Sequence, residues 1–123
     1  MNKNNSDELE KNVARIVQLI MEKKGEKIVT LDLRGITSVA DFFVIASGNS
    51  SVHVKAIADE VYEKLKKEDG IIPWHVEGNE AQKWLLLDYV DIVVHIFGYE
   101  ARAYYSLEKL WEDSKITKFE TDY

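Results

Sequence analysis

Apolar residues recur at helical spacing in two long stretches of the chain. The first stretch carries one stripe, made of Leu9, Val13, Ile16, Val17, Ile20 and Met21. The second, after the turn at residues 48–51, carries Val54, Ile57, Ala58, Val61 and Leu65. Steps of three and four place such residues on one face of a helix. The pattern therefore predicts two amphipathic helices, the first capped by Ser6 and the second ended by Gly70.

Shorter apolar stretches predict strands. Residues 27–33 alternate between apolar and polar, and residues 42–47 are almost wholly apolar, as in a strand covered on both faces. Residues 71–76 form a further candidate, which Pro73 restricts to a sheet edge. A last helix is predicted from about residue 100 to 113, and residues 114–123 carry too little pattern to assign.

The most apolar stretch, WLLLDYVDIVVHIF at residues 84–97, also contains two acids and an imidazole. Its content of β-branched, leucine and aromatic residues favours a β-hairpin with Tyr89 and Val90 at the turn. The opposed pairs in this register are Asp88 with Asp91, Leu86 with Val93, and Trp84 with His95. Because side chains alternate along a strand, the hairpin has two chemically distinct faces.

One face of the predicted hairpin is wholly apolar and must pack on helices: Leu85, Leu87, Ile92, Val94 and Ile96. The other is mixed: Trp84, Leu86, Asp88, Asp91, Val93, His95 and Phe97. Aromatic anchors beside polar groups are typical of binding patches, and a basic partner would relieve the repulsion between two opposed aspartates. Two structural alternatives remain. An aspartate can bond the turn backbone, and Trp84 can cover the sheet beneath a helix.

Composition favours a single domain that acts in the cytoplasm. The chain has 123 residues, no cysteine, 16 basic and 22 acidic residues, and a net charge of −6. Its first residues show neither a secretory signal nor a transit peptide, and no apolar run is long enough to span a membrane. The acidic balance disfavours direct nucleic-acid binding and suits a basic protein partner.

The candidates for catalytic chemistry are weak. The turn Gly48-Asn49-Ser50-Ser51 could cradle a phosphate, as in nucleotidyltransferases, or Ser50 could simply cap the following helix. A nucleotidyltransferase also needs a pair of carboxylates for Mg²⁺, whereas strand 27–33 offers only Asp32. The three histidines lack metal-site spacing, and His75 is placed to meet Glu77 on one strand face. We therefore expect no enzyme activity, no metal and no cofactor.

Four separated blocks of the sequence together resemble the Iojap-type ribosomal silencing factors. They are ADFFVIASGNSSVHVKAIAD at 40–59, VEG at 76–78, WLLLDYVDIVVHIF at 84–97 and RAYYSLEKLWED at 102–113. The resemblance implies binding to the large ribosomal subunit through its fourteenth ribosomal protein, on the intersubunit face. It further implies a steric block of subunit joining and repression of translation during starvation or stationary phase.

Carried over by position, the resemblance implies a set of residues that bind the ribosomal protein: Trp84, Asp88, Tyr89, Asp91, His95, Arg102 and Tyr105. Glu108 and Trp111 also match the family's closing helix block. Val90 stands where the family usually has glycine. Because a β-branched residue disfavours a positive φ, the turn type and the hairpin register remain open.

The expected fold class is α/β, a single domain over residues 1–123 with a folded core of about 7–113 and a C-terminal tail at 114–123. A mixed sheet of about five strands flanked by helices is expected. The resemblance adds a nucleotidyltransferase-like fold without the catalytic carboxylates. Two other function classes remain alternatives: a nucleotide-binding enzyme of nucleotidyltransferase type, and a structural protein that self-associates through the aromatic patch. A homodimer of the free protein is also compatible with silencing.

Overall fold

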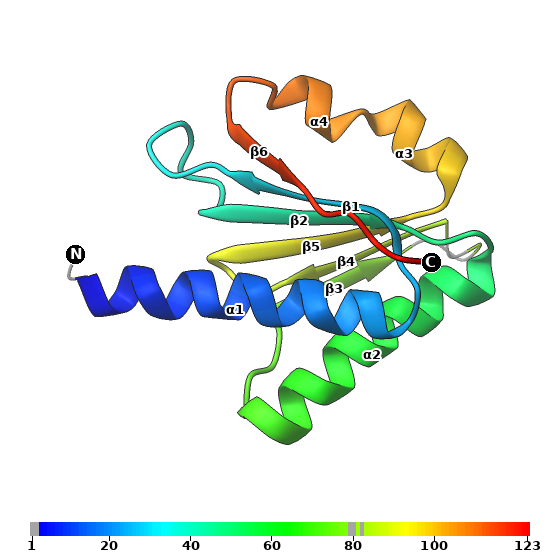
Figure 1. Ribbon diagram of the computed structural model, residues 1–123, viewed down its shortest axis with the longest axis horizontal. Coiled ribbons are helices and arrows are strands. Elements are labelled where there is room, and N and C mark those ends of the chain that lie inside the picture. Colours follow the sequence, from blue (N-terminus) through cyan, green and yellow to red (C-terminus); the bar gives the residue numbers. More distant parts are fainter. Residues whose placement is uncertain (1–2, 79–80, 82) are drawn as a thin grey trace.

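The computed structural model describes residues 3–78, 81 and 83–123. The helices are α1 (Lys3–Glu22), α2 (Ser51–Asp69), α3 (Tyr99–Tyr105) and α4 (Leu107–Leu110). The strands are β1 (Glu26–Asp32), β2 (Phe42–Ser47), β3 (His75–Gly78), β4 (Trp84–Asp88), β5 (Ile92–Phe97) and β6 (Lys115–Lys118). They form one mixed sheet in the order β3-β4-β5-β2-β1-β6 (Figure 1).

The centre of the sheet is the parallel pair β2 and β5, and both strands are buried along their whole length. Their continuous apolar sequences agree with this position, because a strand covered on both faces has no solvent side. The other pairings in the sheet are antiparallel. The α/β class and the mixed sheet flanked by helices are therefore confirmed, with six strands instead of about five.

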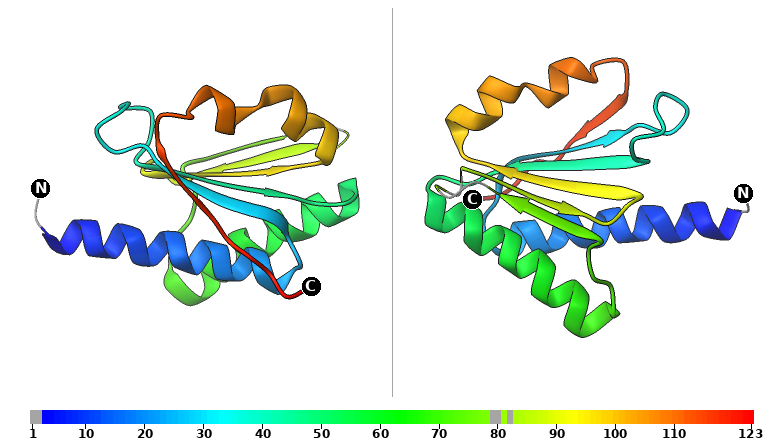
Figure 2. Two further views of the ribbon diagram at one scale, coloured as in Figure 1. Left: turned by 45° about the horizontal axis from the view of Figure 1, so that its top comes forward. Right: turned by 180° about the vertical axis from the view of Figure 1, so that it is seen from behind.

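Helices lie on both faces of the sheet (Figures 1 and 2). On one face, α1 and α2 bury the stripes that the sequence pattern predicts, against Val44, Val94 and Ile96 of the central strands. On the other face, α3 and α4 cover a second apolar cluster built on β1, β2 and β5. Helix α2 begins at the cap Ser50 and ends at Gly70, whose φ of 68° is left-handed.

The β4–β5 hairpin differs in register from the prediction. Its last strand pair is Asp88 with Val93, and Trp84 pairs with Phe97 instead of His95. The turn residues are Val90 and Asp91, since the Tyr89 N–H donates to the Ile92 carbonyl at 2.8 Å. The predicted turn was therefore one residue too early.

The register correction has a local physical cause at Val90. This residue takes a φ of 74°, and its N–H donates to Asp88 Oδ1 at 2.8 Å. The Asp91 N–H then bonds the Tyr89 carbonyl at 2.9 Å, which closes a γ-turn. Moving the turn by one residue shifts the pairing by two. The strand residues keep their predicted faces because the strand period is also two, whereas Asp91 leaves the mixed face and becomes a turn residue.

Further boundaries also differ from the prediction. The edge strand predicted at residues 71–76 is β3 at His75–Gly78, so Pro73 precedes the strand. Helix α1 begins at Lys3, so Ser6 lies inside it and is not its cap. The last helix is broken at Ser106, whose φ of 47° separates α3 from α4. Residues 115–118 form β6, which pairs with β1 and completes the sheet. Within the described chain, no helix is both long and apolar enough to cross a membrane.

Candidate binding face on strand β4

Strand β4 lies second from the edge of the sheet, between β5 and the edge strand β3. On the side of the sheet that carries α3, β3 and β4 present alternate side chains, and the end of α3 lies beside them. We call the resulting surface the β4 face; it consists of His75, Glu77, Trp84, Leu86, Asp88 and Tyr105. It contains three of the seven residues that the sequence resemblance assigns to partner binding.

An aromatic stack anchors this face. The Trp84 ring lies 5.8 Å from that of Phe97 and 6.1 Å from that of His95, with interplanar angles of 8° and 5°. Tyr105 of α3 packs against the same indole at 5.1 Å. Trp84 is therefore held on several sides and remains only partly exposed. The alternative in which Trp84 covers the sheet beneath a helix holds in part, because Tyr105 of α3 contacts the indole.

The β4 face is only half covered. The residues of α3 and α4 that join the second apolar cluster pack over β1, β2 and β5, and Figure 2 shows both helices on that side of the sheet. Leu86 and Asp88 are partly exposed, while His75 and Glu77 are exposed. On the neighbouring helix, Tyr105 is 48% exposed and Tyr104 82%. The β4 face is therefore a partly exposed apolar surface bordered by tyrosine rings.

Acidic side chains border this surface. Glu77 Oε2 accepts a hydrogen bond from the His75 ring at Nε2, at 2.7 Å, and the sequence suggested this pair. Asp88 Oδ1 accepts the Val90 N–H, and the Asp88 side chain is partly exposed, while Asp91 is exposed. The local backbone role proposed for a turn aspartate thus applies to Asp88. The negative charge around the face suits a basic partner.

Two of the candidate residues lie outside the β4 face: His95 is buried and Tyr89 is partly buried. Tyr89 packs against the first apolar cluster, on the α2 side of the sheet, and burial raises the pKa of its hydroxyl. His95 is 5% exposed, and burial lowers the pKa of its imidazole to about 4, so the ring is neutral near neutral pH. Neither side chain offers a surface comparable with that of Glu77 or Tyr105.

Arg102 has a structural position. Its guanidinium forms two hydrogen bonds with the Glu108 carboxylate, at 3.2 and 3.0 Å, and donates to Ser47 Oγ at 2.9 Å. These bonds link α3 and α4 to each other and to the end of β2. Bidentate bonds of this kind are strong and directional. Arg102 therefore fixes the helices that border the β4 face.

The geometry around Gly48 disfavours nucleotidyltransferase chemistry. Ser50 Oγ accepts the His53 N–H at 3.1 Å and acts as a helix cap. Asp32 of β1 pairs with Phe42, at the end of β2 opposite Gly48. Asp91 lies at that same end, because its carbonyl accepts the N–H groups of Asp41 and Phe42. At about 3.3 Å per residue, these carboxylates lie roughly 20 Å from the Gly48 turn.

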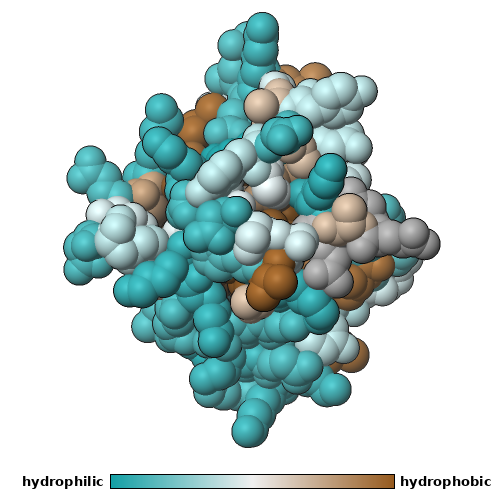
Figure 3. All heavy atoms as spheres, turned by 90° about the vertical axis from the view of Figure 1, so that its right-hand side faces the viewer, coloured by the Kyte–Doolittle hydropathy of each residue, from teal (hydrophilic) through white to brown (hydrophobic). Residues whose placement is uncertain are grey.

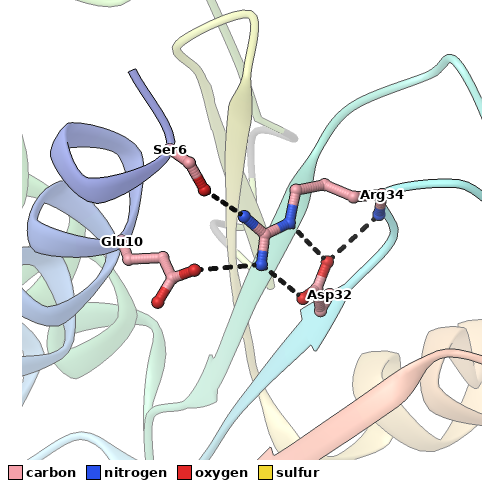
Figure 4. Close-up of polar contacts among 4 residues, drawn as sticks. All are labelled: Ser6, Glu10, Asp32 and Arg34. Carbon is pink, nitrogen blue, oxygen red and sulfur yellow. Dashed lines mark hydrogen bonds and ion pairs between the residues drawn. The ribbon is translucent and has the colours of Figure 1, made fainter. Parts of the chain in front are cut away.

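Asp32 is also engaged elsewhere (Figure 4). Its carboxylate accepts two hydrogen bonds from the Arg34 guanidinium, at 2.9 and 2.7 Å, which hold the pKa of Asp32 below its ordinary value. Arg34 also donates to Ser6 and Glu10, and thereby ties α1 to the end of β1. Among the described residues, no group of three or more His, Asp or Glu side chains could share a metal ion.

Two hollows of the described surface lie away from the β4 face. One, of about 920 Å³, lies between the C-terminal segment and the α1–β1 turn; it is lined by polar residues that include Lys23, Lys27 and Glu120. Another, of about 250 Å³, lies at the Gly48 turn. Figure 3, which faces this end of the molecule, shows mainly hydrophilic side chains. The first hollow also contains His53 and Glu26, whose side chains are engaged with the Lys23 carbonyl at 2.7 Å and the Tyr99 hydroxyl at 2.6 Å.

Sequence reasoning missed Tyr104 as a member of this region. It packs edge-on against Tyr105 at 5.1 Å and extends the aromatic border of the β4 face. The exposed pair Tyr-Tyr was visible in the sequence, but its approach to Trp84 depends on the break at Ser106 and on the docking of α3. Only the packing of distant segments brings these rings together.

Comparison with known proteins places this fold in a family. The model RsfS, described as ribosomal silencing factor during starvation, matches residues 6–122. The ribosomal silencing factor RsfS of Halalkalibacterium halodurans is 45% identical over 104 residues, which are 85% of this chain and 88% of that protein. A mouse protein named mitochondrial assembly of ribosomal large subunit protein 1 is 32% identical over 100 residues, 78% of this chain and 43% of its own. A crystal structure of a protein from Chromobacterium violaceum agrees with a TM-score of 0.78 and 33% identity, over 90% of this chain and 92% of that one. The chain belongs to the family of ribosomal silencing factors.

Proposed function

We propose that this protein silences ribosomes by binding the large ribosomal subunit through its β4 face. The contact is made with the fourteenth large-subunit ribosomal protein, on the surface that meets the small subunit. A bound molecule of this size then blocks subunit joining sterically and represses translation during starvation or stationary phase. The cytoplasm is the place of action that follows from this proposal.

The half-open aromatic and acidic surface beside Trp84 carries the proposal. Tyr104 and Tyr105 supply large, rigid contact area, and Leu86 supplies an apolar centre. Glu77 and Asp91 supply negative charge at the border, which complements the basic surface common on ribosomal proteins. The family name and the large subunit in the name of the mouse relative support a ribosomal partner.

The proposed activity is steric and not catalytic. Ser50 is used as a helix cap, Asp32 is paired with Arg34, and the carboxylates at the far end of the sheet do not approach Gly48. These contacts support binding as the function over nucleotidyl transfer. Incubation with nucleoside triphosphates and Mg²⁺ is expected to leave the melting temperature unchanged.

Co-sedimentation with purified large subunits, small subunits and intact ribosomes tests the proposal. We expect the protein to pellet with large subunits alone and to reduce their joining with small subunits. Its absence from every ribosomal fraction would contradict the proposal. In that case only the family membership and the fold would stand.

Charge substitutions locate the contact. Glu77→Lys changes an exposed residue of the β4 face, whereas Asp88→Asn removes a charge but keeps an acceptor for the Val90 N–H. Both are expected to weaken binding to large subunits, with little change in melting temperature. Glu63→Lys is the matched control, because Glu63 is an exposed residue of α2 on the opposite side of the sheet. Equal losses in all three variants would place the contact elsewhere.

The free protein is also proposed to form a homodimer through the same surface. Two copies that pair through the β4 face would hide Trp84 and Leu86 from water, and the ribosomal protein would then have to displace one copy. Sedimentation equilibrium of the pure protein measures this association. A homodimer that Tyr104→Ala dissociates, and that large subunits dissociate as well, is the expected signature.

A further inference from the structure

His95 and Trp84 are connected by a hydrogen bond under the β4 face. The indole N–H of Trp84 donates to His95 Nδ1 at 3.3 Å, and the two rings are nearly parallel. The two residues belong to neighbouring strands, where His95 pairs with Leu86. Because the imidazole is buried and the indole partly exposed, the bond joins the interior to the proposed contact surface.

The direction of this bond determines the state of the imidazole. An indole N–H only donates, so Nδ1 of His95 must be free of a proton in order to accept. The neutral ring therefore carries its proton on Nε2. That nitrogen has no hydrogen-bond partner among the described residues, although the Phe43 ring lies edge-on at 4.6 Å. Protonation of Nδ1 would place two donors against each other and break the contact.

A histidine is an unfavourable choice at this position if stability alone matters. A buried N–H without a partner destabilises the folded state, whereas an apolar ring of similar size would fill the same space without that cost. Its neighbours Phe43 and Phe97 are apolar rings. What the imidazole adds is an acceptor for the Trp84 N–H, in a ring nearly parallel to the indole.

We propose that His95 is a positioning residue, which holds the Trp84 indole in a fixed orientation on the β4 face and thereby prepares it for the ribosomal partner. This inference rests on the proposed function for its binding consequence. His95 itself does not touch the partner. An anchor that is already ordered loses less side-chain entropy on binding, and so binds more tightly.

Two substitutions separate the roles of the imidazole. His95→Phe keeps a flat ring of similar size and removes the acceptor. His95→Asn keeps an acceptor oxygen at the position of Nδ1 and removes the ring. The first readout is the indole ¹H–¹⁵N resonance of Trp84, assigned by its absence in Trp84→Phe. We expect its exchange with solvent to rise at least about tenfold in His95→Phe, and to stay within about threefold in His95→Asn.

The second readout is the affinity for purified large subunits. A single lost hydrogen bond corresponds to about a three- to tenfold change, so His95→Phe is expected to bind that much more weakly. The same substitution in a Trp84→Phe background is expected to change affinity less than about twofold, because the indole N–H is already absent. A merely structural role for His95 would produce equal losses in both backgrounds.

The inference is overturned if the Trp84 indole exchanges equally in wild type and His95→Phe. It is also overturned if the affinity loss persists undiminished in the Trp84→Phe background. Failure of the proposed function gives a different result, since the wild-type protein would then not sediment with large subunits. In that case the indole resonance alone decides whether His95 positions Trp84.

Discussion

At the scale of single residues, the β4–β5 turn holds a β-branched residue, Val90, in a strained left-handed backbone conformation. Val90 has a φ of 74° and is 58% exposed. A β-branched residue in that region is strained, at a typical cost of about 1–3 kcal/mol. The hydrogen bonds from Val90 to Asp88 and from Asp91 to Tyr89 hold the conformation in place.

Replacing Val90 with glycine is expected to stabilise the protein. Glycine adopts a positive φ without strain, although the more flexible unfolded chain offsets part of the gain. We expect the free energy of unfolding to rise by about 0.5–2 kcal/mol in chemical denaturation. Gly70→Ala is the matched control, since Gly70 has a φ of 68° in open space and should lose stability. A destabilised Val90→Gly would show that the valine side chain makes a needed contact.

The buried imidazole of His95 predicts a pH dependence of stability. Its folded pKa of about 4 lies below the ordinary 6.5, so the unfolded chain binds a proton first as the pH falls. Stability is therefore complete above about pH 6.5 and declines as the pH falls towards about 4.

Urea unfolding checks this dependence. Between about pH 7 and about pH 5, the free energy of unfolding is expected to fall by about 2 kcal/mol from His95. His95→Phe should remove most of this decline, whereas substitution of the exposed His75 should leave it. An identical decline in His95→Phe and wild type would assign the effect to other groups.

At the scale of secondary-structure elements, α3 and α4 depend on side-chain contacts with the sheet. They have seven and four residues, too few to be stable as isolated helices in water. Leu107 and Trp111 pack on the second apolar cluster, and Arg102 joins Glu108 to Ser47. The position of Tyr105 at the border of the β4 face therefore depends on these contacts.

Removal of the Arg102 guanidinium is expected to loosen both helices. Arg102→Met keeps most of the apolar stem and loses three charge-assisted hydrogen bonds. We expect the free energy of unfolding to fall by about 1.5–3 kcal/mol, with faster amide exchange in α3 than in α2. Glu108→Gln, which keeps the shape of the acceptor, should show a smaller effect. Unchanged exchange in α3 would mean that the apolar contacts alone hold it.

At the scale of the whole molecule, charge and surface shape act together. The chain has a net charge of −6, and acids border the β4 face where the basic partner is proposed to bind. Long-range attraction of this kind raises the association rate and is screened within about 8–10 Å at ordinary salt. The aromatic contacts are not screened in this way.

Salt is therefore expected to weaken binding to large subunits mainly through the association rate. Raising the salt concentration from about 0.05 M to about 0.2 M should slow association severalfold and change dissociation little. Glu77→Lys should reduce the salt dependence, and Glu63→Lys should reduce it less. Stopped-flow binding measures both rates. A salt-independent association rate would remove the electrostatic part of the proposal.

The elements that the sequence predicted correctly are those in which local pattern and tertiary position agree. The stripe of α2 became buried as predicted, and the apolar run of β2 became a central strand. The strand residues of the hairpin lie on their predicted faces although the register was wrong, because the pairing was shifted by two residues and side chains alternate with a period of two. Strand β6 was missed because its partner, β1, is distant in the sequence. The break at Ser106 was missed because α3 and α4 are placed by packing on the second apolar cluster.

The sequence by itself determined the α/β class, the two amphipathic helices, the apolar face of the hairpin and the family resemblance, because these depend on periodicity and composition along the chain. Only the tertiary structure decided which candidate side chains meet. It brought Tyr105 over Trp84, buried His95 beneath them, and separated Asp32 from Gly48 by the length of a strand. The reason is physical: side-chain burial and charge pairing are set by neighbours across the sheet, and a linear pattern does not name those neighbours.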